Sequence, residues 1–364
     1  VVAKKLLTTG KYHYDITHFH SLLSGSGEIF IAIGLFFGSE HFGSLIQFSG
    51  LISILGIVKK IKNDNKFYYF LLILTSPVIL FLSSTAKPQL FHICSSSVIF
   101  CSYLFTNSKS LNLTEKNWRL IVSILVLIVS VTAKFNFIIS SALIGLIILY
   151  SSLKDKNFIY LILSLILCFF IFYFPVILSK VNNFGGNIFQ YFISPLPLNI
   201  IGLEEFQNYL VRYGRGYNPI EIIFTTKFNK FTQCVGIAIF YLLIINFKNI
   251  RVRITLAITL TYIFAHYFYG QFMGRSFLEP LFWILLISAK YGVIYRIKLF
   301  EFFCRLQALA VISGIIFGIY SLTPGSLSSK LKVKVLNKNA NGFALFEWSN
   351  NILKKEDVAF SLHR

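Results

Sequence analysis

Ten apolar stretches, separated mostly by short connections, run through this chain. A helix that crosses a bilayer needs about 20 mainly apolar residues. The stretches that approach this length are 42–60, 67–84, 88–106, 118–134, 136–152, 157–178, 231–247, 252–270, 277–297 and 302–321. The pattern predicts an all-α fold, a polytopic transmembrane helical bundle of about ten spans. A further stretch, 27–38, is too short to cross, and we expect it to lie in the interface or to enter partway.

Basic residues fall mainly on every second connection between these stretches. The first connection holds Lys59, Lys60, Lys62 and Lys66, and the third, fifth, seventh and ninth connections are also basic. Short cytoplasmic loops of membrane proteins are rich in Lys and Arg, so these connections are predicted to be cytoplasmic. The other connections hold few basic residues, apart from the long connection 179–230, and both ends of the chain are predicted to lie outside.

The composition argues against two other classes of protein. The chain is 55% hydrophobic and 13% charged, with a mean hydropathy of +0.70, which is too apolar for a soluble domain of 364 residues. The net charge of +20 comes from Lys and Arg beside apolar stretches, so it does not indicate nucleic acid binding. The five cysteines lie in apolar stretches without a CxxC pair, which is typical of core residues.

The pattern divides the chain into five parts. We expect an extracytoplasmic first loop with membrane-surface helices at 1–41, six transmembrane helices at 42–178, an extracytoplasmic loop at 179–230, four transmembrane helices at 231–321 and the start of an extracytoplasmic C-terminal domain at 322–364. The chain begins at Val1 without Met and ends abruptly, so we expect it to be a fragment of a longer protein.

The outer N-terminal part holds a cluster of His, Tyr and acidic side chains. Asp15, His18, His20 and Glu28 all fall within the segment KYHYDITHFHSLLSGSGE. Such side chains can bind a divalent metal ion or act as general acid and base, but they are equally typical of an interfacial loop anchored at the headgroups. His18 and His20 are two residues apart and do not share a helix face, which argues against a helical zinc pair.

Three isolated basic residues stand on outer connections that are otherwise poor in charge. Lys87 lies with Gln89 in SSTAKPQLFH, Lys134 lies in TAKFN, and Arg275 lies in YGQFMGRSFLEP. An ammonium or guanidinium group at this depth suits a phosphate or diphosphate, and lysines on successive outer connections could converge on one anion. The alternatives are lysines that reach out to the headgroups and an Arg275–Glu279 pair at i,i+4.

The long connection also carries polar residues that suit a sugar or headgroup site, although each alone is weak evidence. They are Glu204, Glu205, Arg212, Arg215 and Tyr217. The sequence contains no Gly-rich phosphate loop, no nucleophile elbow and no H-E-x-x-H motif.

These segments together resemble the GT-C superfamily of integral membrane glycosyltransferases, particularly the bacterial members that take a sugar from a polyprenyl phosphate. VAKKLLTTGKYHYD and SLLSGSGEIFIAIGLFFG are similar to the first outer loop of that family. SSTAKPQ is similar to an outer turn that often carries lysine or acidic residues, and FEWSNNILKKEDVAF to the opening of a periplasmic C-terminal domain. The resemblance covers nearly the whole chain by topology, but only these segments by motif.

The resemblance implies an inverting transfer of a sugar from a polyprenyl-phosphate donor to a glycan, lipid or protein acceptor, on the extracytoplasmic face of a bacterial inner membrane. A carboxylate of the first outer loop would be the general base, and basic residues would hold the phosphate. The key Asp of the family usually follows a first spanning helix, so we expect both to precede Val1 and the full protein to have eleven or more spans.

The resemblance also suggests site residues in this chain. Because the key Asp is expected to precede Val1, the candidates for the base are second choices, whereas the phosphate-binding candidates are carried over directly. Asp15 and Glu28 are candidates for the general base, and a divalent metal ion is left open. The candidates for substrate binding are Lys87, Gln89, Lys134, Arg275, His18 and His20.

Two other functions stay open on the sequence. A transporter or flippase of a lipid-linked saccharide would need charges in mid-span and broken helices, and the apolar stretches are nearly free of such charges. A polymerase or ligase of surface polysaccharide would also use arginines of an outer loop, and Arg212 and Arg215 would be its natural site.

Overall fold

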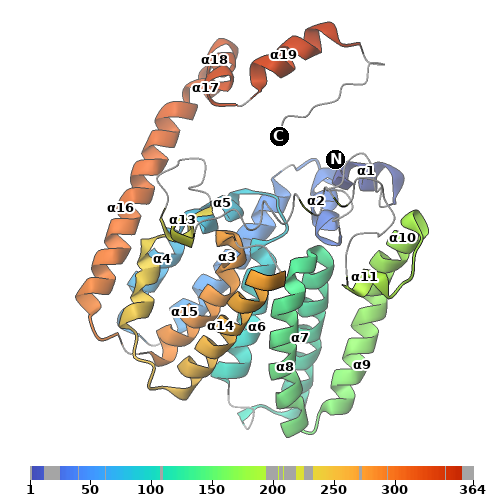
Figure 1. Ribbon diagram of the computed structural model, residues 1–364, viewed down its shortest axis with the longest axis vertical. Coiled ribbons are helices and arrows are strands. Elements are labelled where there is room, and N and C mark those ends of the chain that lie inside the picture. Colours follow the sequence, from blue (N-terminus) through green and yellow to red (C-terminus); the bar gives the residue numbers. More distant parts are fainter. Residues whose placement is uncertain are drawn as a thin grey trace. The chain divides into compact units, whose positions relative to one another are not determined.

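The described part of the computed structural model consists mainly of helices (Figure 1). It describes residues 2–11, 25–39, 41–61, 63–106, 110–193, 204, 208, 219–224, 233–269, 273–292, 294–340 and 342–354. Within these ranges no strand is formed, apart from one isolated bridge between Ile245 and Ile294, so the prediction of an all-α fold is confirmed. The chain divides into two compact units, Val1–Gln307 and Ala308–Arg364.

Five helical segments of the described chain are long and apolar enough to cross a membrane, or six if one bent pair counts as a single span. They are α3 (Phe42–Lys60), α7 (Leu113–Ala133), Phe135–Lys154 with α8 (Ile138–Lys154), Phe158–Phe184 with α9 (Phe158–Cys168) and α10 (Phe174–Phe184), and Ile297–Leu327 with α16 (Ile297–Leu322). Several apolar helices of this length indicate a membrane protein, and each coincides with a predicted span.

The predicted span 67–84 is broken rather than continuous. It forms α4 (Lys66–Leu74) and α5 (Pro77–Ser84), which meet at an angle of 61°. Pro77 has no N–H and interrupts the helical hydrogen bonds. The carbonyl of Leu72 accepts a hydrogen bond from Gln307 Nε2 at 3.3 Å, so a side chain of α16 replaces a bond that the break removes.

The predicted span 231–247 does not form a regular α-helix in its described residues. It contains a 3-10 helix, η6 (Ile237–Ile244), of eight residues. A 3-10 helix rises about 2 Å per residue, so η6 extends about 16 Å, well short of the bilayer core. It begins after Gly236 at φ 108°, and Ala238 N–H donates to Gln307 Oε1 at 2.9 Å. Residues 237–244 are therefore not a regular α-helix, and the span predicted at 231–247 is not confirmed.

Three further helices correspond to predicted spans, and a fourth corresponds to the short apolar stretch. They are α6 (Leu90–Phe105), α14 (Ile250–Tyr269), α15 (Leu278–Tyr291) and α2 (Gly27–Phe36). With 16 and 14 residues, α6 and α15 are shorter than the predicted stretches 88–106 and 277–297. At 10 residues, α2 is the short helix expected for 27–38.

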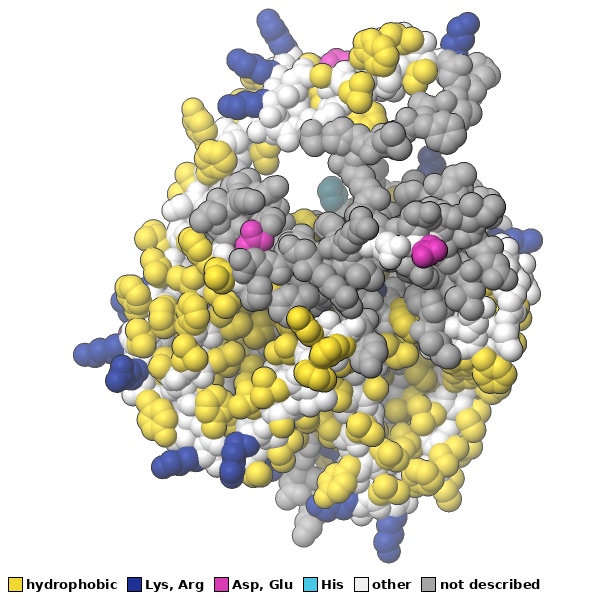
Figure 2. Space-filling view, viewed as in Figure 1, with side chains coloured by type: hydrophobic (Ala, Val, Ile, Leu, Met, Phe, Trp, Pro, Cys, Tyr) yellow, Lys and Arg dark blue, Asp and Glu magenta, His cyan; other side chains and the backbone are white. Residues whose placement is uncertain are grey.

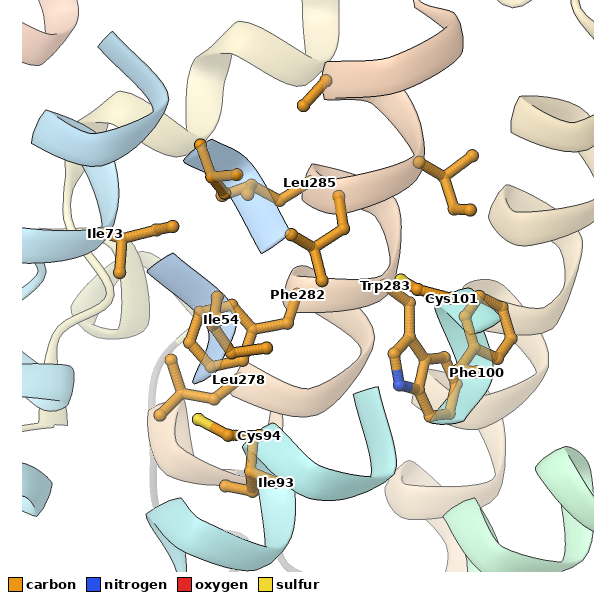
Figure 3. Close-up of a cluster of buried hydrophobic side chains, with 14 of the residues drawn as sticks. Ile54, Ile73, Ile93, Cys94, Phe100, Cys101, Leu278, Phe282, Trp283 and Leu285 are labelled. Carbon is orange, nitrogen blue, oxygen red and sulfur yellow. The ribbon is translucent and has the colours of Figure 1, made fainter. Parts of the chain in front are cut away.

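The core of the first unit lies where α3, α4, α6 and α15 meet (Figure 3). Phe100 of α6 stacks on Trp283 of α15, with ring centroids 4.7 Å apart and ring planes at 13°. Helices in a bilayer approach closely where small residues face the neighbour. Gly50 of α3 is such a residue, since a Cβ there would lie 2.7 Å from the Cα of Phe91. All five cysteines are buried, as predicted for core residues.

The basic connections meet at one end of the first unit. Asn63 Nδ2 of the α3–α4 connection donates to the carbonyl of Ala289 at 2.6 Å, near the end of α15. Lys290 Nζ donates to the carbonyl of Phe105 at 3.4 Å, at the end of α6. The first, third and ninth connections therefore lie together, as a bundle with alternating connections requires.

The surface of the helices is strongly apolar. Figure 2 shows hydrophobic side chains over most of the described part of the visible face, with Lys and Arg mainly at its margins. On α9, Ile159 is 72% exposed and Leu163 is 57% exposed. Exposed apolar side chains along a helix of spanning length suit a lipid environment.

The second unit contains three short helices after α16. They are α17 (Pro324–Leu327), α18 (Ser329–Asn339) and α19 (Phe343–Ile352), and none of them has a buried residue. The start of an extracytoplasmic C-terminal domain at 322–364 therefore stays a prediction.

Candidate functional site

The end of the first unit opposite the basic connections brings together residues of three connections that the sequence predicts to be outer. Lys134 Nζ donates to Gln89 Oε1 at 3.2 Å, and Gln89 Nε2 donates to the carbonyl of Arg275 at 3.5 Å. These contacts join the connections before α6, between α7 and α8, and before α15. Gln89 thus lies at the centre of a group that the sequence places far apart.

The position of Gln89 is fixed by the start of α6. The first N–H groups of a helix have no partner within it. Gln47 of α3 supplies one, because its Oε1 accepts from the N–H groups of Gln89 and Phe91 at 3.1 and 3.0 Å. Gln47 and Gln89 are both buried, at 3% and 5% exposure. The Gln89 side chain is therefore held at the end of the bundle rather than in open solvent.

Lys134 follows the last residue of α7 in an extended conformation and is half-buried. Burial is the main cause that lowers the pKa of its ammonium group from 10.5 to about 7, and the positive charges of Arg275 and Lys87 contribute to this shift. Its hydrogen-bond acceptor Gln89 is a neutral amide. Because this acceptor is neutral, the hydrogen bond does not cancel the charge of Lys134, and the two further cations nearby favour an anion.

Arg275 lies in a short 3-10 helix, η7 (Gly274–Ser276), and is half-buried. Its Nε is buried without a hydrogen-bond partner. Lys87 is exposed, with Nζ 5.6 Å from the centre of the Phe81 ring. We refer to Lys87, Lys134 and Arg275 as the cation cluster.

Glu279 does not pair with Arg275, although both residues are described. It is 1% exposed, its Oε1 accepts a hydrogen bond from Ser96 Oγ, and its Oε2 has no partner. The alternative of an i,i+4 ion pair between Arg275 and Glu279 is therefore wrong. The carboxyl group is turned toward α6 because Ser96 offers a buried donor there.

A cavity of about 10 Å³ lies among these residues. It is lined by Gln89, Ile93, Lys134, Asn136, Phe137, Tyr262, His266, Arg275, Ser276 and Glu279. His266 is 1% exposed and both of its ring nitrogens lack a partner. Sequence reasoning missed His266 and Tyr262, and a polar side chain near one end of an apolar stretch was the available signal.

The start of α2 packs beside the same end of the bundle. Ser26 N–H donates to the carbonyl of Thr132 at 3.1 Å, and a Cβ on Gly27 would lie 2.5 Å from Pro88 and 3.4 Å from Ala133. Ser26 and Gly27 immediately precede Glu28 in the chain. The residues they contact include Pro88 and Ala133, which are the chain neighbours of Lys87 and Lys134. Glu28 is half-buried, and burial raises the pKa of its carboxyl group.

Several predicted residues lie outside the described residues. They are Asp15, His18 and His20 of the N-terminal cluster, and Glu205, Arg212, Arg215 and Tyr217 of the long connection. Glu204 is described and exposed. Among the residues that the structure describes, no group of three or more His, Cys, Asp or Glu could hold a metal ion.

The long apolar helices and the polar cluster at one end of them are features of a multi-helix membrane protein. More specifically, the chain belongs to the family described as DUF1420 N-terminal domain, whose model matches residues 1–336. The match includes every residue of the cation cluster and the cavity. No curated protein and no solved structure matches the chain.

Proposed function

We propose that this protein is an integral membrane glycosyltransferase that moves a sugar from a polyprenyl-phosphate donor to an acceptor. The observation that carries the proposal is the convergence of Lys134, Gln89 and Arg275 from three separate connections, with Lys87 close enough to lower the pKa of Lys134. Cations gathered in a partly desolvated place stabilise a phosphate more strongly than they would in water.

The cluster would act on the leaving group of the transfer. As the bond between the anomeric carbon and the phosphate oxygen breaks, its electron pair stays on the phosphate. Lys134 and Arg275 would stabilise that charge as it develops, and Arg275 can do so through two N–H groups. Gln89 would hold Lys134 in place through its hydrogen bond.

An apolar groove is the observation that supports a lipid-linked substrate. It has a volume of about 510 Å³. It lies between α7, α8, α9 with the helical turns Phe169–Tyr173 that follow it, and α11 (Gln190–Ile193). Val131 and Ile138, which line it, come three residues before and four residues after Lys134. A polyprenyl chain in this groove would place its phosphate near the cation cluster.

Other parts of the proposal rest on the resemblance. The base that activates the acceptor would be a carboxylate of the first outer loop, with Asp15 and Glu28 as candidates in this chain. The packing of the α2 start against Pro88 and Ala133 brings the Glu28 segment to this end. We place the reaction on the extracytoplasmic face of a bacterial inner membrane, with a glycan, lipid or protein as acceptor.

The test uses the full-length protein in membranes with labelled polyprenyl-phosphate sugars and a panel of acceptors. Release of lipid phosphate is followed for the wild type, Lys87→Ala and Arg275→Ala. We expect release to fall by about a hundredfold or more when one transition-state contact is removed. Lys59→Ala and Arg253→Ala, at exposed positions on basic connections, should release phosphate at the wild-type rate.

A transporter or flippase of a lipid-linked saccharide is the second candidate. The observation in its favour is the 61° break between α4 and α5, since broken helices are typical of transporter sites. In sealed vesicles without an acceptor, a flippase moves the intact lipid-linked sugar across the bilayer. A glycosyltransferase leaves it in place and releases lipid phosphate only when an acceptor is added.

A further inference from the structure

The cavity beside the cation cluster contains buried polar atoms without partners. Glu279 and His266 are each 1% exposed, yet Glu279 Oε2 and both ring nitrogens of His266 make no hydrogen bond. The same is true of Arg275 Nε. Buried polar groups without partners are costly, and they are rare in native proteins. All three side chains line one cavity, so a single bound group there can satisfy several of them.

The size and lining of the cavity define the chemistry of that group. A volume of about 10 Å³ accepts one group of the size of a water molecule. Arg275 Nε can only donate a hydrogen bond, whereas Glu279 Oε2 can accept one and His266 can do either. A metal ion would be repelled by Lys134 and Arg275 on the same cavity. The group that fits both donates and accepts, as a hydroxyl does.

We propose that this cavity binds one hydroxyl group of the ligand whose phosphate is held by the cation cluster. The hydroxyl donates to Glu279 Oε2 and accepts from Arg275 or His266. The inference rests on the proposed function and deepens it, because it names the ligand as a phosphate ester with a hydroxyl close to the phosphate. A saccharide linked directly to phosphate has such a hydroxyl on the neighbouring carbon, whereas a bare lipid phosphate does not.

The experiment compares two phosphodiesters of nearly equal size that differ in one group. Farnesyl 2-hydroxyethyl phosphate carries a hydroxyl two carbons from the phosphate oxygen, and farnesyl propyl phosphate carries a methyl there. We expect the full-length wild-type protein in detergent to bind the hydroxyl compound about tenfold more tightly or better, because a site built to pair with a hydroxyl rejects the analogue that lacks it. Equal affinities for the two compounds would overturn the inference.

Variants assign the preference to the cavity. Glu279→Gln should bring the ratio of the affinities for the hydroxyethyl and propyl compounds toward one. The affinity for farnesyl propyl phosphate itself should not change. His266→Phe should do the same and loses no hydrogen bond, so it serves if Glu279→Gln fails to fold. The control is Ser288→Ala, which should keep the wild-type ratio. Ser288 is a buried serine on α15, the helix of Glu279, and it does not line the cavity. An unchanged ratio in both cavity variants would also overturn the inference.

The proposed function fails in a different way. If the wild type does not bind farnesyl propyl phosphate, or binds it as well in Arg275→Ala and Lys134→Met, the cation cluster is not a phosphate site. If that binding holds and only the hydroxyl preference is missing, the cluster stands and the hydroxyl site is withdrawn.

Discussion

Lys134 and Gln89 are 45 residues apart in the chain, and the ammonium group of one donates a hydrogen bond to the amide oxygen of the other at 3.2 Å. The acceptor is neutral, so the bond positions the lysine without cancelling its charge. Gln89 is also bonded to the backbone of Arg275. One amide side chain therefore organises two of the three cations.

Replacing Gln89 with Glu should weaken anion binding. A carboxylate at this position would pair with Lys134 and compete with the phosphate, so we expect the affinity for farnesyl propyl phosphate to fall about tenfold or more. Gln89→Met keeps the size without adding charge and should lose less affinity. Isothermal titration calorimetry in detergent measures both, and a Glu variant that binds as tightly as the wild type would contradict the electrostatic account.

Anion binding should weaken as the pH rises above 7. The pKa of Lys134 is lowered to about 7, and a bound phosphodiester favours the protonated form, so binding takes up a proton. Above that pKa, affinity for a diester that does not titrate should fall toward about tenfold per pH unit. Titrations with farnesyl propyl phosphate between pH 6 and 9 measure the slope, and Lys134→Met should remove it.

The stability of the unliganded protein should respond to the same group in the opposite direction. Lys134 has its usual pKa of 10.5 when unfolded and about 7 when folded, so between these values the unfolded chain binds more protons. Stability from this residue therefore rises with pH from about 7 to 10.5. Comparing the melting temperature of the wild type with that of Lys134→Met across this range isolates the contribution. A difference that stays constant with pH would show that the lysine is not perturbed.

Removing the Ser96 hydroxyl should destabilise the bundle. Ser96→Ala leaves Glu279 Oε1 without the donor it now has, and the loss of a partner for a buried polar group costs about 1–3 kcal/mol. The control is Ser95→Ala on the same helix, where the hydroxyl bonds only to the carbonyl of Phe91. Thermal or denaturant melts in detergent compare the two variants, and an equal effect would mean that Glu279 is not sensitive to Ser96.

Two glycines of α3 should respond in opposite ways to alanine. A Cβ at Gly50 would lie 2.7 Å from the Cα of Phe91, so Gly50→Ala pushes α3 and α6 apart and should cost about 1–3 kcal/mol. A Cβ at Gly56 would meet nothing within 4 Å. Gly56→Ala should leave stability unchanged or raise it by about 0.5–1 kcal/mol, because alanine is the better helix former. Melts of the two variants test the α3–α6 contact directly.

The sequence predicted the long helices well because hydropathy and terminal charge are local signals. The span expected at 42–60 coincides with α3 (Phe42–Lys60), which ends at two lysines. The break before Pro77 lay within a stretch whose average hydropathy suggests one span. The 3-10 form of 237–244 has no local signal in the apolar sequence, and the start of this helix is bonded to Gln307, which lies 69 residues from its partner Ala238.

The candidate site was predicted in part for a similar reason. Lys87, Lys134 and Arg275 stood out because a basic residue on a connection predicted to be outer is an exception to the charge pattern. The role of Gln89 as their common partner needed the structure. His266 lies inside an apolar stretch with no local partner, and Glu279 suggested a bond to Arg275 that Ser96 of another helix replaces.

The burial of every cysteine has a practical consequence. Cys94, Cys101, Cys168, Cys234 and Cys304 are all buried, so this part of the protein offers a quiet background for water-soluble thiol reagents. A single cysteine at exposed Lys87 or exposed Lys59 would then be the reactive thiol of its variant. Labelling intact cells with an impermeant maleimide would modify one position and spare the other, and so would assign each end of the bundle to its side of the membrane.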